Sequence, residues 1–302
     1  MKKITMTELA RIAGCSHSTV SRALSGNARI SQETRRKILD LAGCMHYQAQ
    51  RGRRVAAIIW MVICSVPDQY PLILIQHLAI ELHRHGFRNF IVPTDDISLL
   101  DDLYITGAVS LSPVNRIARS WSAARPTPLV TVNDYSEAIG GVFSVISDEQ
   151  GTMESIVEML VAAGRRRPLF ILSSADTLCS QLRLQAYRRT LERSGIEPIV
   201  VDYVWDVPVE SWALPDCDSF ILAGETLAPL AAGLRRRFPR AVPVVWRFDS
   251  REYPGEITVN QNFARLAEEA VDLLECTIAN PASAGNRLVP CLIRSSLRSS
   301  RK

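Results

Sequence analysis

Residues 4–47 read ITMTELARIAGCSHSTVSRALSGNARISQETRRKILDLAGCMHY, and this stretch decides the fold of the N-terminal part of the chain. Thr5 and Glu8 stand three residues apart before an apolar-periodic run, which is the spacing of a capping box. That spacing predicts a helix that starts directly after Thr5 and ends at Gly14. Its inner face would carry the apolar residues Leu9, Ala10 and Ala13.

Two more helices are predicted within the same stretch. Ser16 stands where it can cap a helix over 17–24, and Ser31 stands where it can cap a third helix. The sequence Ser-Gly-Asn at 25–27 breaks the chain between them. Short helices joined by a three-residue turn with glycine are the layout of a helix-turn-helix unit.

The outward positions of the second predicted helix suit a nucleic acid. They carry His17, Ser18, Ser21 and Arg22, which are donors able to reach base edges and phosphates. The helix N-terminus at Ser16 also offers free backbone N–H groups to a phosphate. The alternative is a small three-helix module with an ordinary polar face.

The motif T-x-x-E-L-A-x-x-A-G-x-S-x-x-T-V-S-R-x-L-x-G, followed by I-S-x-x-T-R, resembles the DNA-binding headpiece of the lac-repressor (LacI/GalR) family of bacterial transcription regulators. The resemblance covers 5–47 nearly without gaps and places the headpiece at 1–46. It implies that His17, Ser18 and Arg22 face major-groove bases, and that the domain works as a dimer on an inverted repeat. It also implies that six residues lie near backbone phosphates: Thr5, Ser16, Thr19, Ser21, Ser31 and Thr34.

Charge is distributed unevenly along the 302 residues, of which 47% are hydrophobic. Residues 1–54 hold 11 of the 35 Lys and Arg but only 3 of the 31 Asp and Glu, a balance of +8. The rest of the chain therefore holds 24 basic and 28 acidic residues, a balance of −4. A basic N-terminal part on a mildly acidic body is typical of a protein that reads nucleic acid.

Cysteine usage and hydropathy predict a cytoplasmic protein. None of the seven cysteines has metal-like spacing and most stand in apolar runs, so we expect reduced, buried thiols. No signal peptide is visible, because Glu8 and Arg11 interrupt any apolar N-terminal segment. The most apolar stretch, 55–66, is too short to span a bilayer.

The connector at 47–54, YQAQRGRR, departs from the family. Family members usually continue with a hinge that folds on DNA, starts with Pro-Asn and inserts a leucine into the minor groove. Here Ala49 and Gln50 replace the Pro-Asn start, and Gly52 weakens any helix. Two interpretations stay open, a plain solvated linker or contact with the minor groove and backbone through three basic residues: Arg51, Arg53 and Arg54.

Residues 55–294 alternate apolar runs with longer amphipathic runs, which predicts parallel, doubly wound α/β structure. At about 240 residues this body is too long for one ordinary sheet. The family implies two Rossmann-like lobes resembling periplasmic sugar-binding proteins, with a ligand in the cleft. It also implies three chain crossings, which we place near 147, between 250 and 256, and near 288. The polar, basic tail at 295–302 is expected to be disordered.

Several helices of this body are predicted from apolar periodicity and from flanking glycine and proline. Pro71 would occupy the first position of a helix that ends before Gly86. A shortened helical crossover is expected at 97–103, and further helices at 116–124 and 227–238.

Ligands of such sheets bind at the carboxyl ends of strands, so strand-end residues are the pocket candidates. Five of them match family positions: Asn133, Asp134, Arg183, Asp249 and Gln261. An acidic acceptor, an arginine and amides suit a polyhydroxylated ligand such as a sugar. Aromatic residues are candidate stacking walls, although core packing is their commoner role: Tyr70, Trp205, Trp246 and Phe248.

Departures from the family keep other ligands open. Gly224-Glu225 replaces the family's Asn-Asp, and Arg247 replaces its Gly beside the predicted pocket. A phosphorylated or acidic effector is one alternative, and a cleft without a ligand is another.

The sequence thus predicts a homodimeric, sequence-specific regulator, usually a repressor in this family, that is gated by a small effector. One alternative is a DNA-binding regulator whose body is only a dimerisation scaffold, and another is an enzyme or ligand carrier. No phosphate loop or nucleophile elbow is present, so we predict no catalytic residue and no cofactor. His83 and His85 stand close to Glu81 but point in different directions on a helix, which makes a poor metal site.

Overall fold

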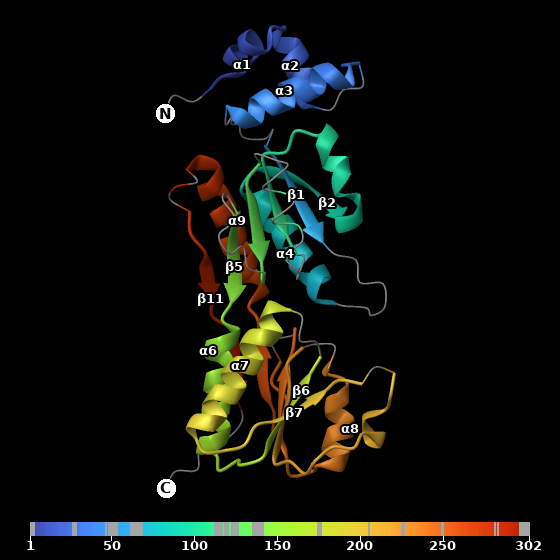
Figure 1. Ribbon diagram of the computed structural model, residues 1–302, viewed down its shortest axis with the longest axis vertical. Coiled ribbons are helices and arrows are strands. Elements are labelled where there is room, and N and C mark those ends of the chain that lie inside the picture. Colours follow the sequence, from blue (N-terminus) through green and yellow to red (C-terminus); the bar gives the residue numbers. More distant parts are fainter. Residues whose placement is uncertain are drawn as a thin grey trace. The chain divides into compact units, whose positions relative to one another are not determined.

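The structure is a computed structural model, shown in Figure 1. It describes residues 4–25, 29–45, 47, 54–60, 69–111, 117, 121, 127–134, 142–173, 177–204, 206–224, 227–248, 251–280, 282 and 284–295. The chain divides into two units. The first comprises residues 1–65, 73–145 and 267–287, and the second comprises 66–72, 146–266 and 288–302.

Three helices form the headpiece: α1 (Met6–Ala13), α2 (His17–Leu24) and α3 (Gln32–Cys44) (Figure 1). The predicted capping box is present, because Thr5 Oγ1 accepts from Glu8 N at 3.2 Å and Glu8 Oε2 accepts from Thr5 N at 2.8 Å. Gly14 ends α1 in the left-handed conformation with φ of 70°. The buried core of the headpiece comprises Leu9, Ala10, Ala13, Val20, Ala23, Ile38, Ala42 and Tyr47.

Replacement of Thr5 by alanine should destabilise the headpiece by about 1 kcal/mol, because the backbone N–H of Glu8 loses its acceptor at the helix N-terminus. Thermal unfolding of the full chain, followed by circular dichroism, measures this loss. Thr7→Ala is the matched control, since Thr7 is exposed inside α1 rather than at its cap. Equal stability of the two variants would contradict the capping role.

The first lobe is the sheet of the first unit, with strand order β11-β5-β4-β3-β1-β2. Pairs β2–β1, β1–β3, β3–β4 and β4–β5 are all parallel. The strands are β1 (Arg54–Trp60), β2 (Phe87–Pro93), β3 (Gly107–Ser110), β4 (Leu129–Val132), β5 (Val142–Ser147) and β11 (Arg287–Val289). Helix α4 (Gln69–Arg84), the 3-10 helix η1 (Thr94–Asp102) and helix α9 (Phe263–Ala279) complete it. Helix α9 approaches β3 closely, because a Cβ at Gly107 would lie 2.7 Å from Leu274 Cδ1.

The second lobe is the sheet of the second unit, with strand order β12-β10-β9-β8-β6-β7. The pair β10–β12 is antiparallel, and the other pairs are parallel. The strands are β6 (Pro168–Leu172), β7 (Ile199–Asp202), β8 (Ser219–Leu222), β9 (Val242–Trp246), β10 (Ile257–Asn260) and β12 (Leu292–Ser295). The helices are α6 (Glu149–Ala162), α7 (Leu178–Arg193), η2 (Val209–Ser211) and α8 (Leu230–Arg237).

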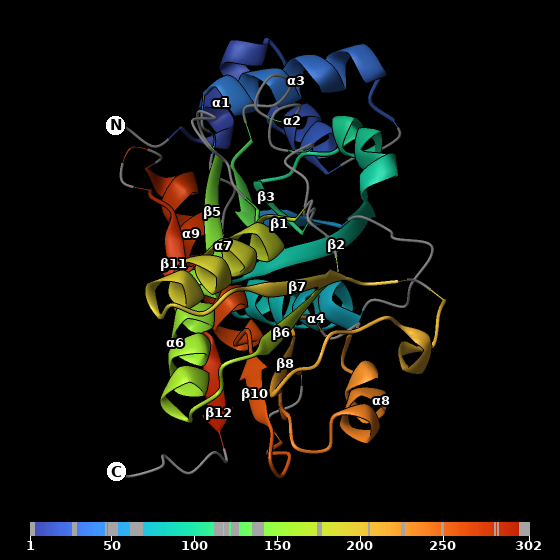
Figure 2. The same ribbon diagram turned by 60° about the horizontal axis from the view of Figure 1, so that its bottom comes forward.

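Alternate residues of the second sheet face two different cores, as the period of a strand requires. Phe170 packs in one core with α6 and α7, which lie side by side in Figures 1 and 2. Leu169 and Ile171 pack in the other core with α8 and η2. Helices on both faces of a mainly parallel sheet confirm the predicted doubly wound α/β class.

Several predicted boundaries differ in the structure. Pro71 is the third residue of α4, and the crossover expected at 97–103 is the 3-10 helix η1. Strand β10 remains paired in the second sheet and the division of the chain follows Leu266, which is later than the crossing expected at 250–256. Ser295 belongs to β12, while the remainder of the predicted tail lies outside the described residues. Of the helix predicted at 116–124, only 117 and 121 are described, and both are helical.

The cysteines differ from expectation. Of the six that the structure describes, only Cys217 is buried, whereas Cys44 and Cys276 are exposed. Apolar neighbours in sequence do not bury a thiol on the outer side of a helix, which is where Cys44 lies at the end of α3. Within the described parts of the chain, no helix combines the length and apolar character needed to cross a membrane.

Candidate functional site

Helix α2 is held at its N-terminus by Ser16. Ser16 Oγ accepts from Thr19 N at 3.1 Å, and it lies 2.8 Å from both Ser18 Oγ and Thr19 Oγ1. Val20 and Ala23 are buried against α1 and α3. These contacts fix which side of α2 faces outward.

The outward side of α2 presents the predicted base-reading residues. His17, Ser18 and Arg22 are all exposed. Their side chains are hydrogen-bond donors of different length on one rigid helix, which is the arrangement needed to contact base edges in a major groove.

Five of the six residues predicted near phosphates lie at the N-terminus or in the first turn of a helix, and Ser21 lies in the middle of α2. Thr5, Ser16 and Ser31 are the N-caps of α1, α2 and α3. Ser31 Oγ donates to Thr34 Oγ1 at 2.8 Å and accepts from Thr34 N at 3.2 Å. Helix N-termini favour anions through their free N–H groups and their dipoles. Thr19, Ser21 and Thr34 are half-buried, so these hydroxyls remain partly accessible.

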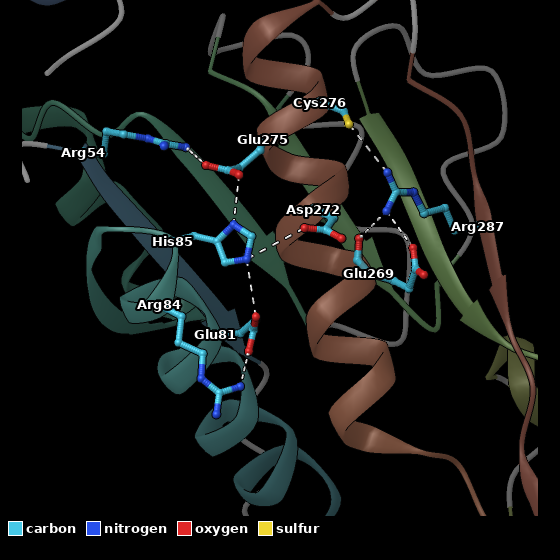
Figure 3. Close-up of polar contacts among 9 residues, drawn as sticks. All are labelled: Arg54, Glu81, Arg84, His85, Glu269, Asp272, Glu275, Cys276 and Arg287. Atoms are coloured by element: carbon cyan, nitrogen blue, oxygen red, sulfur yellow. Dashed lines mark hydrogen bonds and ion pairs between the residues drawn. The ribbon is translucent and has the colours of Figure 1, made fainter. Parts of the chain in front are cut away.

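Arg54 belongs to the first lobe instead of the connector, because it is the first residue of β1. Its guanidinium pairs with Glu275 Oε1 at 2.6 Å (Figure 3). The same guanidinium stacks over the Phe87 ring, with its central carbon 3.8 Å from the ring centroid. Its side chain is only 17% exposed, which leaves little of it for DNA. Arg51 and Arg53, also predicted to contact DNA, lie outside the described residues.

Glu275 also contacts His85, because Nδ1 of His85 lies 2.9 Å from Oε2 of Glu275 (Figure 3). Burial raises the pKa of Glu275, but the hydrogen bonds from His85 and Arg54 outweigh burial and hold the pKa of this carboxyl below its usual value. Glu81 lies on the other side of the imidazole, 3.3 Å from Nε2. The described residues hold no group of three or more His, Cys, Asp and Glu suited to a metal ion.

In the second lobe, Arg183 and Gln261 meet at the carboxylate of Glu149, which is not among the ligand residues predicted from the sequence. Arg183 Nε donates to Glu149 Oε2 at 2.6 Å, and its Nη1 donates to the Ala223 carbonyl at 2.8 Å. Gln261 Nε2 donates to Glu149 Oε1, which also accepts from Ser147 Oγ at 2.6 Å. Glu149 is fully buried, and Arg183 and Gln261 are 6% and 7% exposed.

Both the carboxylate of Glu149 and the guanidinium of Arg183 stay charged in this buried network. Burial raises the pKa of Glu149, but the charge and hydrogen bond of Arg183 outweigh burial and hold its pKa below the usual value. Burial lowers the pKa of Arg183, but Glu149 more than reverses that effect, so the guanidinium stays protonated. Glu149 begins α6 two residues after the end of β5, so its position near a strand end is the sequence signal that could have pointed to it.

A pH dependence follows from the lowered pKa of Glu149. Because its folded-state pKa lies below the unfolded value, the pair contributes stability above about pH 4.5 that is lost as the pH falls through the folded pKa. We therefore expect the unfolding free energy of the wild type to fall more steeply below about pH 5 than that of Glu149→Gln. Urea titrations from pH 7 to pH 3 measure both slopes, and equal slopes would contradict the charged pair.

Two of the other predicted ligand residues belong to the first unit. Asn133 and Asp134 are buried after β4 in the first unit, and Asn133 has a left-handed φ of 56°. The Asp134 carbonyl accepts from Thr131 Oγ1 at 2.9 Å and from Ser144 Oγ at 2.6 Å. Asp249 and Trp205 lie outside the described residues.

The predicted aromatic walls lie in two places in the second unit. Tyr70 packs against Phe248 and Phe263, with ring centroids 6.4 and 5.5 Å away. Trp246 lies beside Arg183, whose guanidinium carbon is 5.1 Å from its ring centroid. Trp246 Nε1 is buried, and none of the described residues accepts a hydrogen bond from it. A buried donor of this kind suits an oxygen atom of a ligand or of a water molecule.

Comparison with known proteins adds the family context. Residues 5–50 match the family model described as bacterial regulatory proteins of the lacI family. The HTH-type transcriptional regulator DegA of Bacillus subtilis is 23% identical over 212 residues, which cover 64% of this chain and 62% of that protein. The chain spans about three fifths of the length of the first curated relatives that it matches.

Solved structures share the fold. The lac repressor dimer bound to operator and the anti-inducer ONPF has a TM-score of 0.68 at 19% identity, over 97% of this chain and 98% of that chain. A complex of the transcriptional regulator CelR with cellobiose has a TM-score of 0.67 at 20% identity, over 99% of this chain and 100% of that chain. Both match the headpiece together with two α/β lobes.

Proposed function

We propose that the chain, whose residues 5–50 match the model of the lacI family of bacterial regulatory proteins, is a sequence-specific DNA-binding transcription regulator that acts as a repressor. The observation that carries the proposal is the exposed side of α2, where His17, Ser18 and Arg22 stand on a capped helix. The charge of +8 over residues 1–54 supplies the non-specific attraction to phosphates. Base discrimination then comes from α2 and register from the three helix N-termini.

The regulator acts as a homodimer on an inverted repeat in this proposal. The lac repressor, which shares the fold, is described as a dimer bound to operator. Large apolar side chains on the first lobe support a second copy as partner, since Ile80, Ile91 and Leu99 are 45%, 49% and 62% exposed. A two-fold dimer presents two α2 helices to two half-sites.

A small, uncharged, sugar-like effector is the ligand that the second lobe supports best. Arg183 is neutralised by Glu149, and Arg247 pairs with the fully buried Glu256 at 2.7 Å. Glu256 also pairs with Arg235 at 2.6 Å, so the charge argument rests on Arg183, the cation beside Trp246. Because Glu149 already neutralises Arg183, an anionic effector there would bring an uncompensated charge, which favours a neutral polyol over a phosphorylated ligand. Trp246 Nε1 is a ready donor for one of its oxygens. The transcriptional regulator CelR, which shares the fold, is described as a complex with cellobiose.

The DNA-binding proposal is tested by affinity selection of random double-stranded DNA with the purified full-length chain, followed by sequencing. Enriched inverted repeats with one half-site spacing are expected. Enrichment of single half-sites would retain base reading but contradict the dimer, and no enrichment with or without sugars would overturn the regulator.

A regulator whose α/β body is only a dimerisation scaffold is the second candidate, favoured by the closed Glu149–Arg183 network, in which both partners are already satisfied. A thermal-shift screen of neutral sugars against the matching sugar phosphates distinguishes the two. Stabilisation by neutral sugars alone is expected for the effector proposal. Stabilisation by sugar phosphates alone would contradict the charge argument, and stabilisation by neither class would support the scaffold.

A further inference from the structure

Tyr47, the first residue of the connector, is held by both of its backbone groups. Its N–H donates to the Ala42 carbonyl at the end of α3 at 2.9 Å. Its carbonyl accepts a hydrogen bond from Tyr104 Oη at 2.6 Å. The two tyrosine rings lie 6.1 Å apart at an angle of 52°, and Tyr47 is only 7% exposed. Tyr104 comes from the first lobe and packs against the headpiece core.

The segment that carries Tyr104 also holds the chain on the other side of the connector. Tyr104 follows η1, and Thr106 stands directly before β3. Thr106 N donates to the Val55 carbonyl at 2.7 Å, and Val55 N donates to Thr106 Oγ1 at 3.2 Å. Residues 104–106 are therefore bonded to the chain at Tyr47 and at Val55, on either side of residues 48–53.

The Tyr104 hydroxyl is suited to this role. Burial raises the pKa of Tyr104, so the phenol is neutral and remains a donor throughout the physiological range. Ile105, between the two bonding residues, is buried in the core of the first lobe, which fixes the segment to the sheet.

We propose that residues 104–106 form a strap that positions the headpiece on the first lobe, with Tyr104 as its positioning residue. Closing a short loop at both ends restricts the orientations that its flanking segments can adopt. The strap would thus set how far apart two headpieces stand, although the connector is short and contains Gly52. The effect on the spacing of two headpieces on DNA rests on the proposed regulator function, whereas the contact of residues 104–106 with the headpiece does not.

The first experiment measures the strap without DNA. Backbone ¹⁵N relaxation of the full chain reports whether the headpiece tumbles with the lobes or by itself. In the wild type, the headpiece and first-lobe amides should share one rotational correlation time. Tyr104→Ala should give the headpiece a shorter rotational correlation time than in the wild type. Tyr104→Phe, which removes only the hydroxyl, should give the headpiece a correlation time between those of the wild type and Tyr104→Ala. Tyr203→Ala, at a tyrosine of the second lobe, should leave the headpiece unchanged.

The second experiment measures spacing on the selected DNA. Wild-type affinity should fall when one or two base pairs are inserted between half-sites, and Tyr104→Ala should reduce this preference by about tenfold, on the scale of one hydrogen bond. Affinity for a single half-site should remain unchanged, which a merely unstable headpiece would not allow.

Independent tumbling of the wild-type headpiece, or identical relaxation of wild type and Tyr104→Ala, would overturn the strap. If Tyr104→Ala does not fold, Tyr104→Phe decides by the same two readouts. Failure of the wild type to select any DNA would overturn the regulator but not the strap, because the relaxation measurement alone decides the latter.

Discussion

Arg183→Ala should lower the free energy of unfolding by ~3–5 kcal/mol, the scale for breaking a buried ion pair from one side. Glu149 has no exposed surface and accepts from Arg183 at 2.6 Å. Without the guanidinium, the carboxylate must be buried unpaired or must take up a proton, and the Ala223 carbonyl loses its donor as well. Urea unfolding at pH 7, followed by far-ultraviolet circular dichroism, measures the loss.

The double variant Arg183→Met, Glu149→Met is the sharper comparison. Replacing both charges by apolar side chains leaves no buried charge unpaired, so the double variant should be more stable than the sum of the single losses predicts. Arg236→Ala is the matched control, because its partner Glu210 is half-exposed and solvent screens the pair. This control should unfold nearly as the wild type does. A similarly small loss for Arg183→Ala would show that the buried network contributes little to stability.

Arg22→Ala should cost ~1–3 kcal/mol at the cognate base pair, which is about a tenfold to hundredfold loss of affinity. Arg22 is exposed on α2, where its fork can contact a guanine edge in the major groove. The measurement is a titration of selected operator and scrambled DNA at one stated salt concentration. The loss should appear on the operator and be much smaller on scrambled DNA.

Arg36→Ala is the matched control for charge, since Arg36 is exposed on α3 rather than on α2. It should weaken operator and scrambled DNA alike and reduce the salt dependence of both. If Arg22→Ala behaves in the same way as Arg36→Ala, then Arg22 contacts phosphates and does not read bases.

The sequence alone predicts the position of the base-reading residues, but it does not predict the contacts of the buried network. His17, Ser18 and Arg22 stand on one helix, so its caps and its apolar period already place them on the outward side. Arg183 and Gln261 match family positions, which predicts them as ligand residues. The position of Glu149 near a strand end is visible in the sequence, but only the tertiary structure shows that both residues donate to it. Whether the three contact an effector stays a prediction.

The connector shows the same limit. Arg54 belongs by sequence to a run of basic residues, and a DNA contact was one interpretation of it. In the structure it begins β1 and pairs with Glu275, more than two hundred residues further along the chain. Cysteine burial failed for a related reason, because apolar neighbours in sequence do not say which side of an element faces the core.

The sequence by itself determined the three headpiece helices, their caps, and the α/β class of the body. These features depend on interactions over three or four residues and on apolar periodicity, both of which are visible locally. Only the tertiary structure decided that Glu149 neutralises Arg183 and that Arg54 belongs to β1 and pairs with Glu275. It also decided that the Tyr104 hydroxyl donates to the Tyr47 carbonyl. The physical reason is that partners 34, 57 or more residues apart meet only through strand order and helix packing, which no short stretch of sequence encodes.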